Sequence, residues 1–167
     1  MGVYVNPDAE RFIIDKNDTF YVDKSGLIAC LNRKLNTNGR FFCVTRPRRF
    51  GKSMAANMIA AYYSKGADSR ALFSGMRISD DPSFDRYLNK FNVIKMNLNG
   101  AITTKGKLSV AEYYNSKILP ELRLEFASVN LPDEIPLSWA IQKIYAETNE
   151  KFIFIIDEYD IIIRDER

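Results

Sequence analysis

The chain has no histidine among its 167 residues and only two cysteines, Cys30 and Cys43. Without histidine, the Ser-His-Asp and Cys-His catalytic systems are excluded, and a zinc site is not expected. Two cysteines do not make a metal-ligand set, and with no secretory signal they indicate a reducing compartment. A cytoplasmic location is therefore expected.

Long hydrophobic runs are also lacking. Apolar runs such as residues 152–156 are far too short to cross a bilayer, so no membrane partner is expected. The net charge of +3 falls short of the clustered basic stripe of a nucleic-acid-binding surface, and one tryptophan makes no platform for stacked bases. A nucleic-acid partner is thus unsupported by this chain alone. Ordinary hydrophobic and charged contents, 46% and 27%, are typical of a globular domain.

Apolar spacing predicts an alternation of helices and strands. Ser25 is placed to cap a helix whose apolar positions are Leu27, Ile28, Leu31 and Leu35. Unbroken apolar runs predict buried strands at residues 41–45, 93–98 and 152–156. Helices are predicted over residues 54–63, 109–127 and 137–145, the second bent or split at Pro120, with loops over 66–92. This order predicts an α/β fold with a mainly parallel sheet.

Some aromatic residues fall on the apolar faces of these predicted helices, and we expect them in the core. They are Tyr113, Tyr114, Trp139 and Tyr145.

The segment TRPRRFGKS, residues 45–53, lies between a predicted strand and a predicted helix, and it ends like the G-x-x-x-x-G-K-[ST] phosphate-binding pattern. Gly51 would let the backbone approach phosphate oxygens, Lys52 would bridge the β and γ phosphates, and Ser53 would place its hydroxyl on magnesium. Nucleotide contacts are predicted for Arg46, Pro47, Arg48, Arg49, Phe50, Gly51, Lys52, Ser53 and Met54.

This loop departs from the pattern at its start, where Arg46 replaces the first glycine, so the chain must turn there without one. A Gly-Lys-Ser tripeptide can also be an ordinary surface turn, and Arg48 and Arg49 can be solvated loop charges. The strand before and the helix after favour the phosphate-binding interpretation.

The second candidate site follows the last predicted strand, where residues 152–156 end in Asp157 and Glu158. Acids at the carboxyl edge of a parallel strand lie where ligands bind in open α/β sheets. Asp157 would hold the magnesium, and Glu158 would act as general base on the attacking water, so that Glu158 and Lys52 are the predicted catalytic residues. A strand that simply ends in a solvated acidic turn is the alternative. Each motif is the partner that the other requires, and together they predict nucleotide binding.

Four segments together resemble the AAA-ATPase-like family of bacterial and anaerobic fungal proteins. They are YVDK at residues 21–24, RPRRFGKS at 46–53, LFSGM at 72–76 and IIDEYD at 155–160. The resemblance covers nearly the whole chain, and the RPRRFGKS form of the loop is typical of that family. It implies a P-loop three-layer sandwich, ATP and magnesium as the bound species, and ATP hydrolysis.

Members of the family are usually longer and often carry a nuclease-like domain. On that comparison residues 1–167 are expected to be one P-loop domain, its N-terminal portion, without the sensor residue and arginine finger. The sheet would then expose a flank, which favours self-association. Two alternatives stay open: a nucleotide-binding switch or scaffold without significant hydrolysis, and the ATPase part of a nucleic-acid-processing protein. Tyr21, Asp23 and Lys24 could contact adenine, although local packing and capping are favoured.

Overall fold

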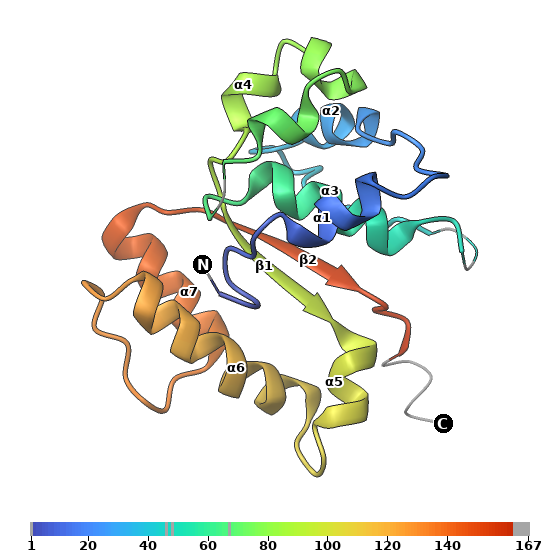
Figure 1. Ribbon diagram of the computed structural model, residues 1–167. Coiled ribbons are helices and arrows are strands. Elements are labelled where there is room, and N and C mark those ends of the chain that lie inside the picture. The colour runs from blue at the N-terminus through green and yellow to red at the C-terminus, as the bar shows by residue number, and fades with distance from the viewer. Residues whose placement is uncertain (1, 46, 48, 67, 162–167) are drawn as a thin grey trace.

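The computed structural model describes residues 2–45, 47, 49–66 and 68–161 (Figure 1). The elements before the first strand are α1 (Glu10–Lys16), α2 (Gly26–Asn32), α3 (Lys52–Tyr63), the short 3-10 helices η1 (Arg70–Phe73) and η2 (Arg77–Asp80), and α4 (Phe84–Tyr87). The remaining elements are β1 (Asn92–Asn97), α5 (Leu98–Thr104), α6 (Val110–Glu125), α7 (Leu137–Thr148) and β2 (Phe152–Asp157).

Strands β1 and β2 pair in parallel, with Asn92 opposite Phe152 and Asn97 opposite Asp157, so both strands end at the same edge. The outer edge of β1 is covered by the N-terminal segment. Val5 forms an antiparallel bridge with Ile94, and the Lys95 amide donates to the Tyr4 carbonyl at 2.9 Å. β1 is therefore hydrogen-bonded on both sides, which makes it the interior strand of the described sheet.

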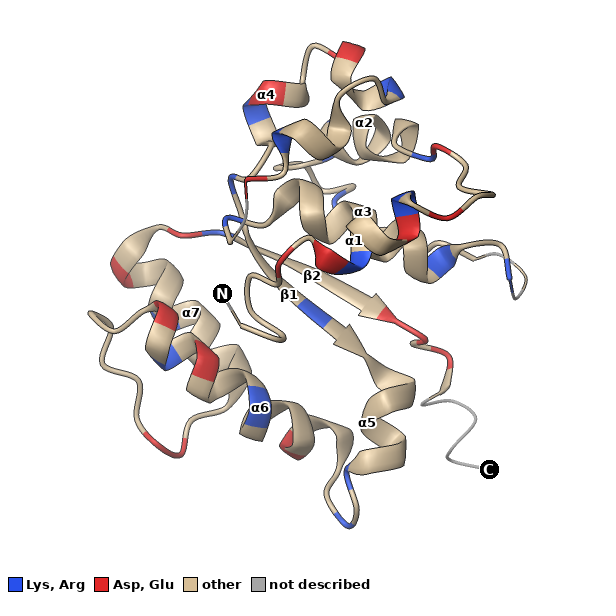
Figure 2. Ribbon diagram, in the orientation of Figure 1, with Lys and Arg blue, Asp and Glu red and all other residues tan. Residues whose placement is uncertain are grey.

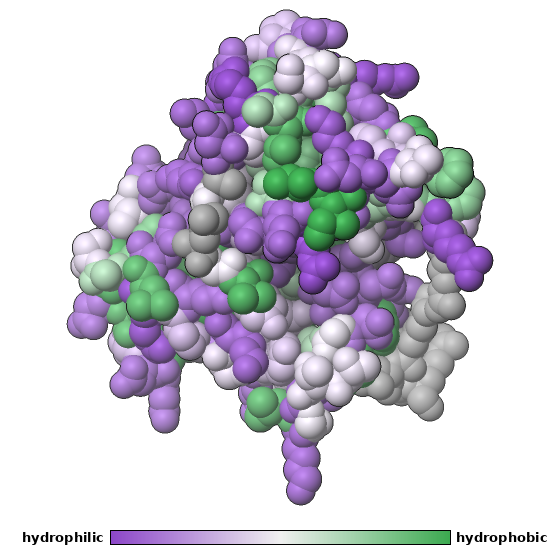
Figure 3. Space-filling view, viewed as in Figure 1, coloured by the Kyte–Doolittle hydropathy of each residue, from purple (hydrophilic) through white to green (hydrophobic). Residues whose placement is uncertain are grey.

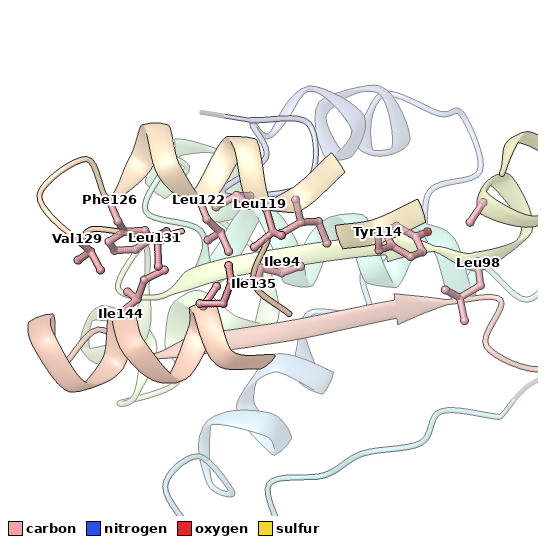
Figure 4. Packing of buried hydrophobic residues seen from close by; sticks show 14 residues of the cluster. Ile94, Leu98, Tyr114, Leu119, Leu122, Phe126, Val129, Leu131, Ile135 and Ile144 are labelled. Atoms are coloured by element: carbon pink, nitrogen blue, oxygen red, sulfur yellow. The ribbon is translucent and has the colours of Figure 1, made fainter. Parts of the chain in front are cut away.

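Helices cover both faces of this sheet, with α1 to α4 on one side and α5 to α7 on the other (Figure 1). Successive side chains of β1 point to opposite faces of the sheet, so the strand contributes to the core on both sides. Ile94 packs with α6 and α7, in the cluster shown in Figure 4, and Val93 packs with α1 and α3 on the opposite face. On the face shown in Figure 3, hydrophobic side chains form several separate patches among hydrophilic ones.

The layer around α3 has an aromatic core whose buried hydroxyls are hydrogen-bonded. The Tyr62 hydroxyl donates to the Phe84 carbonyl at 2.7 Å, and the Tyr63 hydroxyl donates to Asn32 Oδ1 at 2.6 Å. Asn32 Nδ2 in turn donates to the Tyr62 hydroxyl at 3.1 Å. Burial raises the pKa of Tyr62 to about 12 and raises the pKa of Tyr63 as well. This network fixes α3 against α2 and α4, and thereby fixes the start of α3.

The strand predicted at residues 41–45 is wrong. These residues form no regular secondary structure and lie outside the sheet, and Phe41 is 81% exposed. The segment contacts the turn that follows β2 through a side chain, because the Cys43 thiol donates to the Tyr159 hydroxyl at 3.1 Å. A strand needs a partner for its backbone groups as well as apolar side chains, and among the described residues β2 pairs with β1 alone.

Two expectations for the helices also need correction. α6 is one element from Val110 to Glu125 and is not split at Pro120, since Ile118 and Leu122 on either side of the proline are both fully buried in one core. Trp139 is 68% exposed and Tyr145 is 49% exposed, whereas Tyr114 is buried as expected.

The reason lies in the width of the core face of α7. That face is made by Ala140 and Ile144, with Leu137 and Ile141 packed beside them. Trp139 and Tyr145 sit just outside it. Along the described part of the chain, no helix has both the length and the apolar character needed to span a membrane.

The raised pKa of Tyr62 predicts a dependence of stability on alkaline pH. The folded state holds the Tyr62 proton more tightly than the unfolded chain, whose tyrosines titrate near pH 10, so this stabilisation is complete below about pH 10 and is lost as the pH rises toward 12. We expect the free energy of unfolding to fall more steeply over this range in the wild type than in Tyr62→Phe. Urea unfolding at a series of pH values measures both slopes, and equal slopes would contradict the prediction.

Candidate functional site

A cavity of about 440 Å³ lies at the edge where β1 and β2 both end. It is lined by Arg49, Gly51, Lys52, Ser53, Asn99 and Glu158. Residues from the start of α3, the start of α5 and the end of β2 therefore meet in one place. The volume is within the range of small-molecule sites.

The backbone at the start of α3 adopts a conformation suited to anions. Gly51 has φ 72° and stands at the N-cap position of α3, where its carbonyl accepts from the Ala55 amide at 3.0 Å. Arg49 also has a positive φ, 67°. Left-handed residues on either side of Phe50 turn the chain sharply, and such turns form concave groups of amides that bind anions. The first turn of a helix has further amides without intrahelical partners, so α3 adds donors at the same point.

The side chains of the loop point in different directions. Lys52 is half-buried and lines the cavity, and its ammonium donates to the Pro47 carbonyl at 3.4 Å. The Phe50 side chain is exposed, whereas Met54 is half-buried one turn into α3. Lys52 therefore brings a positive charge to the cavity wall, as does Arg49, whose side chain is more exposed.

At the end of β2, Asp157 is buried, with 9% of its surface exposed, and Oδ1 accepts from the Glu158 amide at 3.0 Å. Glu158 has φ 55°, a left-handed conformation that costs energy for a residue with a Cβ. This turn places Glu158 in the cavity wall immediately after the strand. Two acids adjacent in sequence thus occupy different environments, one buried at the strand end and one facing the cavity.

A second lysine, Lys95, lies on β1, the strand that pairs with the strand carrying Asp157. Lys95 on β1 donates to Asn57 Oδ1 on α3, and Asn57 Nδ2 donates to Asp15 Oδ2 at 2.6 Å. Burial lowers the pKa of Lys95, and the carboxylates of Asp157 and Asp15 oppose this shift.

The oxygen donors of Ser53 and Asp157 suit a hard cation whose other ligands are water and phosphate oxygens. The described residues contain no cluster of three or more His, Cys, Asp or Glu side chains that would enclose a metal ion. Ser53 and Asp157 offer one hydroxyl and one carboxylate at the two motifs. Magnesium in nucleotide sites typically binds one or two protein oxygens and completes its shell with phosphate oxygens and water, so this donor set fits it.

The structure brings five of the predicted site residues into one cavity wall. Arg49, Gly51, Lys52, Ser53 and Glu158 share the cavity wall, and Asp157 directly precedes Glu158. Pro47, Phe50 and Met54 belong to the same loop and helix but do not line the cavity. Arg46 and Arg48 lie outside the described residues.

The sequence did not predict the contacts of two residues at or near the cavity. It assigned no role to Asn99, and it favoured local packing for Lys24. Asn99 lines the cavity, and the available signal was its place directly after β1, at the same edge as the acids. Lys24 donates to the Phe50 carbonyl at 2.7 Å, although local packing was favoured for it. Of its neighbours, Asp23 accepts from the Ser25 amide at 2.7 Å, and the Tyr21 hydroxyl contacts Met58 Sδ at 4.0 Å.

A glycine-containing loop that opens a helix, beside a parallel strand that ends in acids, is the arrangement of P-loop nucleotide-binding proteins. The chain belongs to the AAA-ATPase-like family, whose model, described as "Predicted AAA-ATPase", matches residues 11–166.

A curated relative is the "Uncharacterized protein in vnfD 5'region" of Azotobacter chroococcum mcd 1, with 25% identity over 153 residues. The match covers 92% of this chain and 28% of the relative, so the chain spans little more than a quarter of that protein's length. No solved structure matches the chain.

The conformation of Gly51 predicts a local stability cost for any side chain there. A Cβ on Gly51 would lie 2.4 Å from Lys24 Nζ, and its φ of 72° is unfavourable for an L-residue. We expect Gly51→Ala to lower the free energy of unfolding by about 1–2 kcal/mol. Gly26→Ala is the matched control, because a Cβ there meets nothing within 4 Å and its φ is not left-handed. It should be neutral or should stabilise by about 0.4–1 kcal/mol. Equal denaturation midpoints for the two variants would contradict the assignment.

Proposed function

We propose that this chain is the ATP-binding domain of an AAA-like P-loop protein and that it hydrolyses magnesium-ATP. The observation that carries the proposal is one cavity in which the Gly51-Lys52-Ser53 loop meets Glu158, although the two are far apart in the sequence. The helices on both faces of the parallel strands are consistent with a P-loop three-layer sandwich formed by residues 1–167.

The loop would hold the phosphates. Backbone amides at the start of α3 would donate to their oxygens, and the Lys52 ammonium would stabilise the charge that develops on the transferred phosphoryl group. The hydrogen bond from Lys52 to the Pro47 carbonyl is 3.4 Å long, which is longer than the charge-assisted bond that Lys52 would make with a phosphate oxygen.

Magnesium, when bound, would supply electrostatic stabilisation at the β and γ phosphates. Ser53 and Asp157 would hold it, one from each motif. Asp157 is preorganised for this role because the Glu158 amide already fixes one of its oxygens at 3.0 Å.

Glu158 would orient the attacking water and accept its proton. Its left-handed backbone supports this role, since strained backbone at a cavity wall persists where the surrounding structure imposes it and is common at active sites. The side chain lines the same cavity as Lys52, so water and phosphate can be held between them.

Binding is tested by thermal unfolding with and without magnesium-ATP. Ligand at about 100 times its dissociation constant adds about 2.7 kcal/mol, which for a domain of this size raises the unfolding temperature by roughly 5–10 °C. We expect this shift in the wild type and its loss in Lys52→Ala. Lys90→Ala removes an exposed lysine that precedes β1, at the opposite edge of the sheet, and should keep the shift. A cooperatively folded wild type with no shift would rule out the proposed site.

Hydrolysis is tested separately with Glu158→Gln, which keeps the shape of the side chain and removes the base. We expect turnover to fall by about 10²–10⁴-fold while magnesium-ATP binding is retained. Glu147→Gln makes the same change near the end of α7, before β2 begins, and should leave turnover unchanged. Tight binding by a wild type that does not turn over would identify the chain as a nucleotide-holding module instead.

A further inference from the structure

Lys24 contacts the phosphate-binding loop from a distant part of the sequence. Its ammonium donates to the Phe50 carbonyl at 2.7 Å. The proposed function gives this contact no role, because Lys24 does not line the cavity.

The backbone around Lys24 is firmly held on both sides. The Asp23 carboxylate accepts from the amides of Ser25, at 2.7 Å, and Arg77, at 2.8 Å. Burial raises the pKa of Asp23, but these hydrogen bonds outweigh it and leave the pKa below its ordinary value. Ser25 is fully buried, and its hydroxyl accepts from the Ile78 amide at 3.1 Å. The sequence predicted that this side chain would cap α2, but it makes no capping hydrogen bond there. Lys24 therefore extends toward the loop from a turn that is tied to η2.

The contact orients the peptide group between Phe50 and Gly51. The described chain has no cis peptide bonds, and in a trans peptide the carbonyl and the amide point in opposite directions. Since the Phe50 carbonyl faces Lys24, the Gly51 amide must point away from Lys24. Gly51 itself forms part of the cavity wall.

The space occupied by the ammonium depends on the glycine. A Cβ on Gly51 would lie 2.4 Å from Lys24 Nζ, closer than any side-chain contact allows. The absence of a side chain at Gly51 thus serves two ends: it permits the left-handed turn and leaves room for Lys24.

We infer that Lys24 is a positioning residue for polyphosphate binding: by holding the Phe50 carbonyl, it directs the Gly51 amide at the phosphates. This inference rests on the proposed function. It assigns a role to the YVDK segment, in which Asp23 fixes the turn and Lys24 reaches the loop.

The test compares the dissociation constant of magnesium-ATP for the wild type, Lys24→Met, Lys24→Arg and Lys90→Met, measured by calorimetry. The methionine side chain has a similar length but no hydrogen-bond donor. We expect Lys24→Met to bind about tenfold more weakly, which corresponds to the loss of one hydrogen bond from a charged donor. Arg keeps a donor and should restore most of the affinity. Lys90→Met removes the same charge at the opposite edge of the sheet and should bind like the wild type.

Two further readouts separate positioning from other roles. The amide resonance of Gly51 in the nucleotide-free protein should shift in Lys24→Met and not in Lys90→Met. The affinity ratio between wild type and Lys24→Met should persist as the salt concentration is raised. A long-range effect of the lysine charge would instead be screened by salt, and the ratio would fall.

The outcomes are distinct for the function and for the inference. No binding by the wild type overturns the proposed function and the inference with it. Wild-type binding with equal affinity in Lys24→Met overturns the inference alone. The inference also fails if Lys24→Arg binds as weakly as Lys24→Met, if the Gly51 resonance is unchanged, or if the affinity ratio disappears at high salt.

Discussion

The parallel pairing of β1 with β2 is the constraint on which the site depends. Its register places Asn97 opposite Asp157, so the chain leaves both strands at one edge. There β1 leads directly into α5 with Asn99, and β2 leads into the turn at Glu158. A shift of the register would move the acids along the edge and away from the start of α3. The geometry of the cavity therefore depends on backbone pairing along the whole length of the two strands.

The second requirement is that α3 begins at a defined point, and buried polar contacts provide this. Tyr62 and Tyr63 at the end of α3 are hydrogen-bonded to Phe84 and Asn32, and Asn57 in its middle links Asp15 to Lys95 on the sheet. Each of these polar groups would be costly to bury without its partner, so they specify one placement of the helix. The loop before α3 then receives its own support from Lys24.

Local patterns predicted much of the secondary structure. The helices α2, α3, α6 and α7 follow from the spacing of apolar residues, and the strands β1 and β2 follow from unbroken apolar runs, because both of their faces are covered by helices. The same reasoning was wrong for residues 41–45. An apolar run shows that a segment can be buried, but it does not show which backbone will pair with it. Trp139 was misplaced for a related reason, since spacing along a helix does not reveal how wide the face against the core will be.

The sequence by itself determined the chemical groups: a Gly-Lys-Ser turn before a helix, two acids after an apolar strand, and no histidine. These follow from short-range patterns, in which residue type and spacing decide the chemistry. Only the tertiary structure decided that Glu158 and Lys52 line one cavity, that Asn99 joins them, and that Lys24 holds the Phe50 carbonyl. Such contacts join positions far apart in the chain, and they arise from strand register and helix packing, which no local segment encodes.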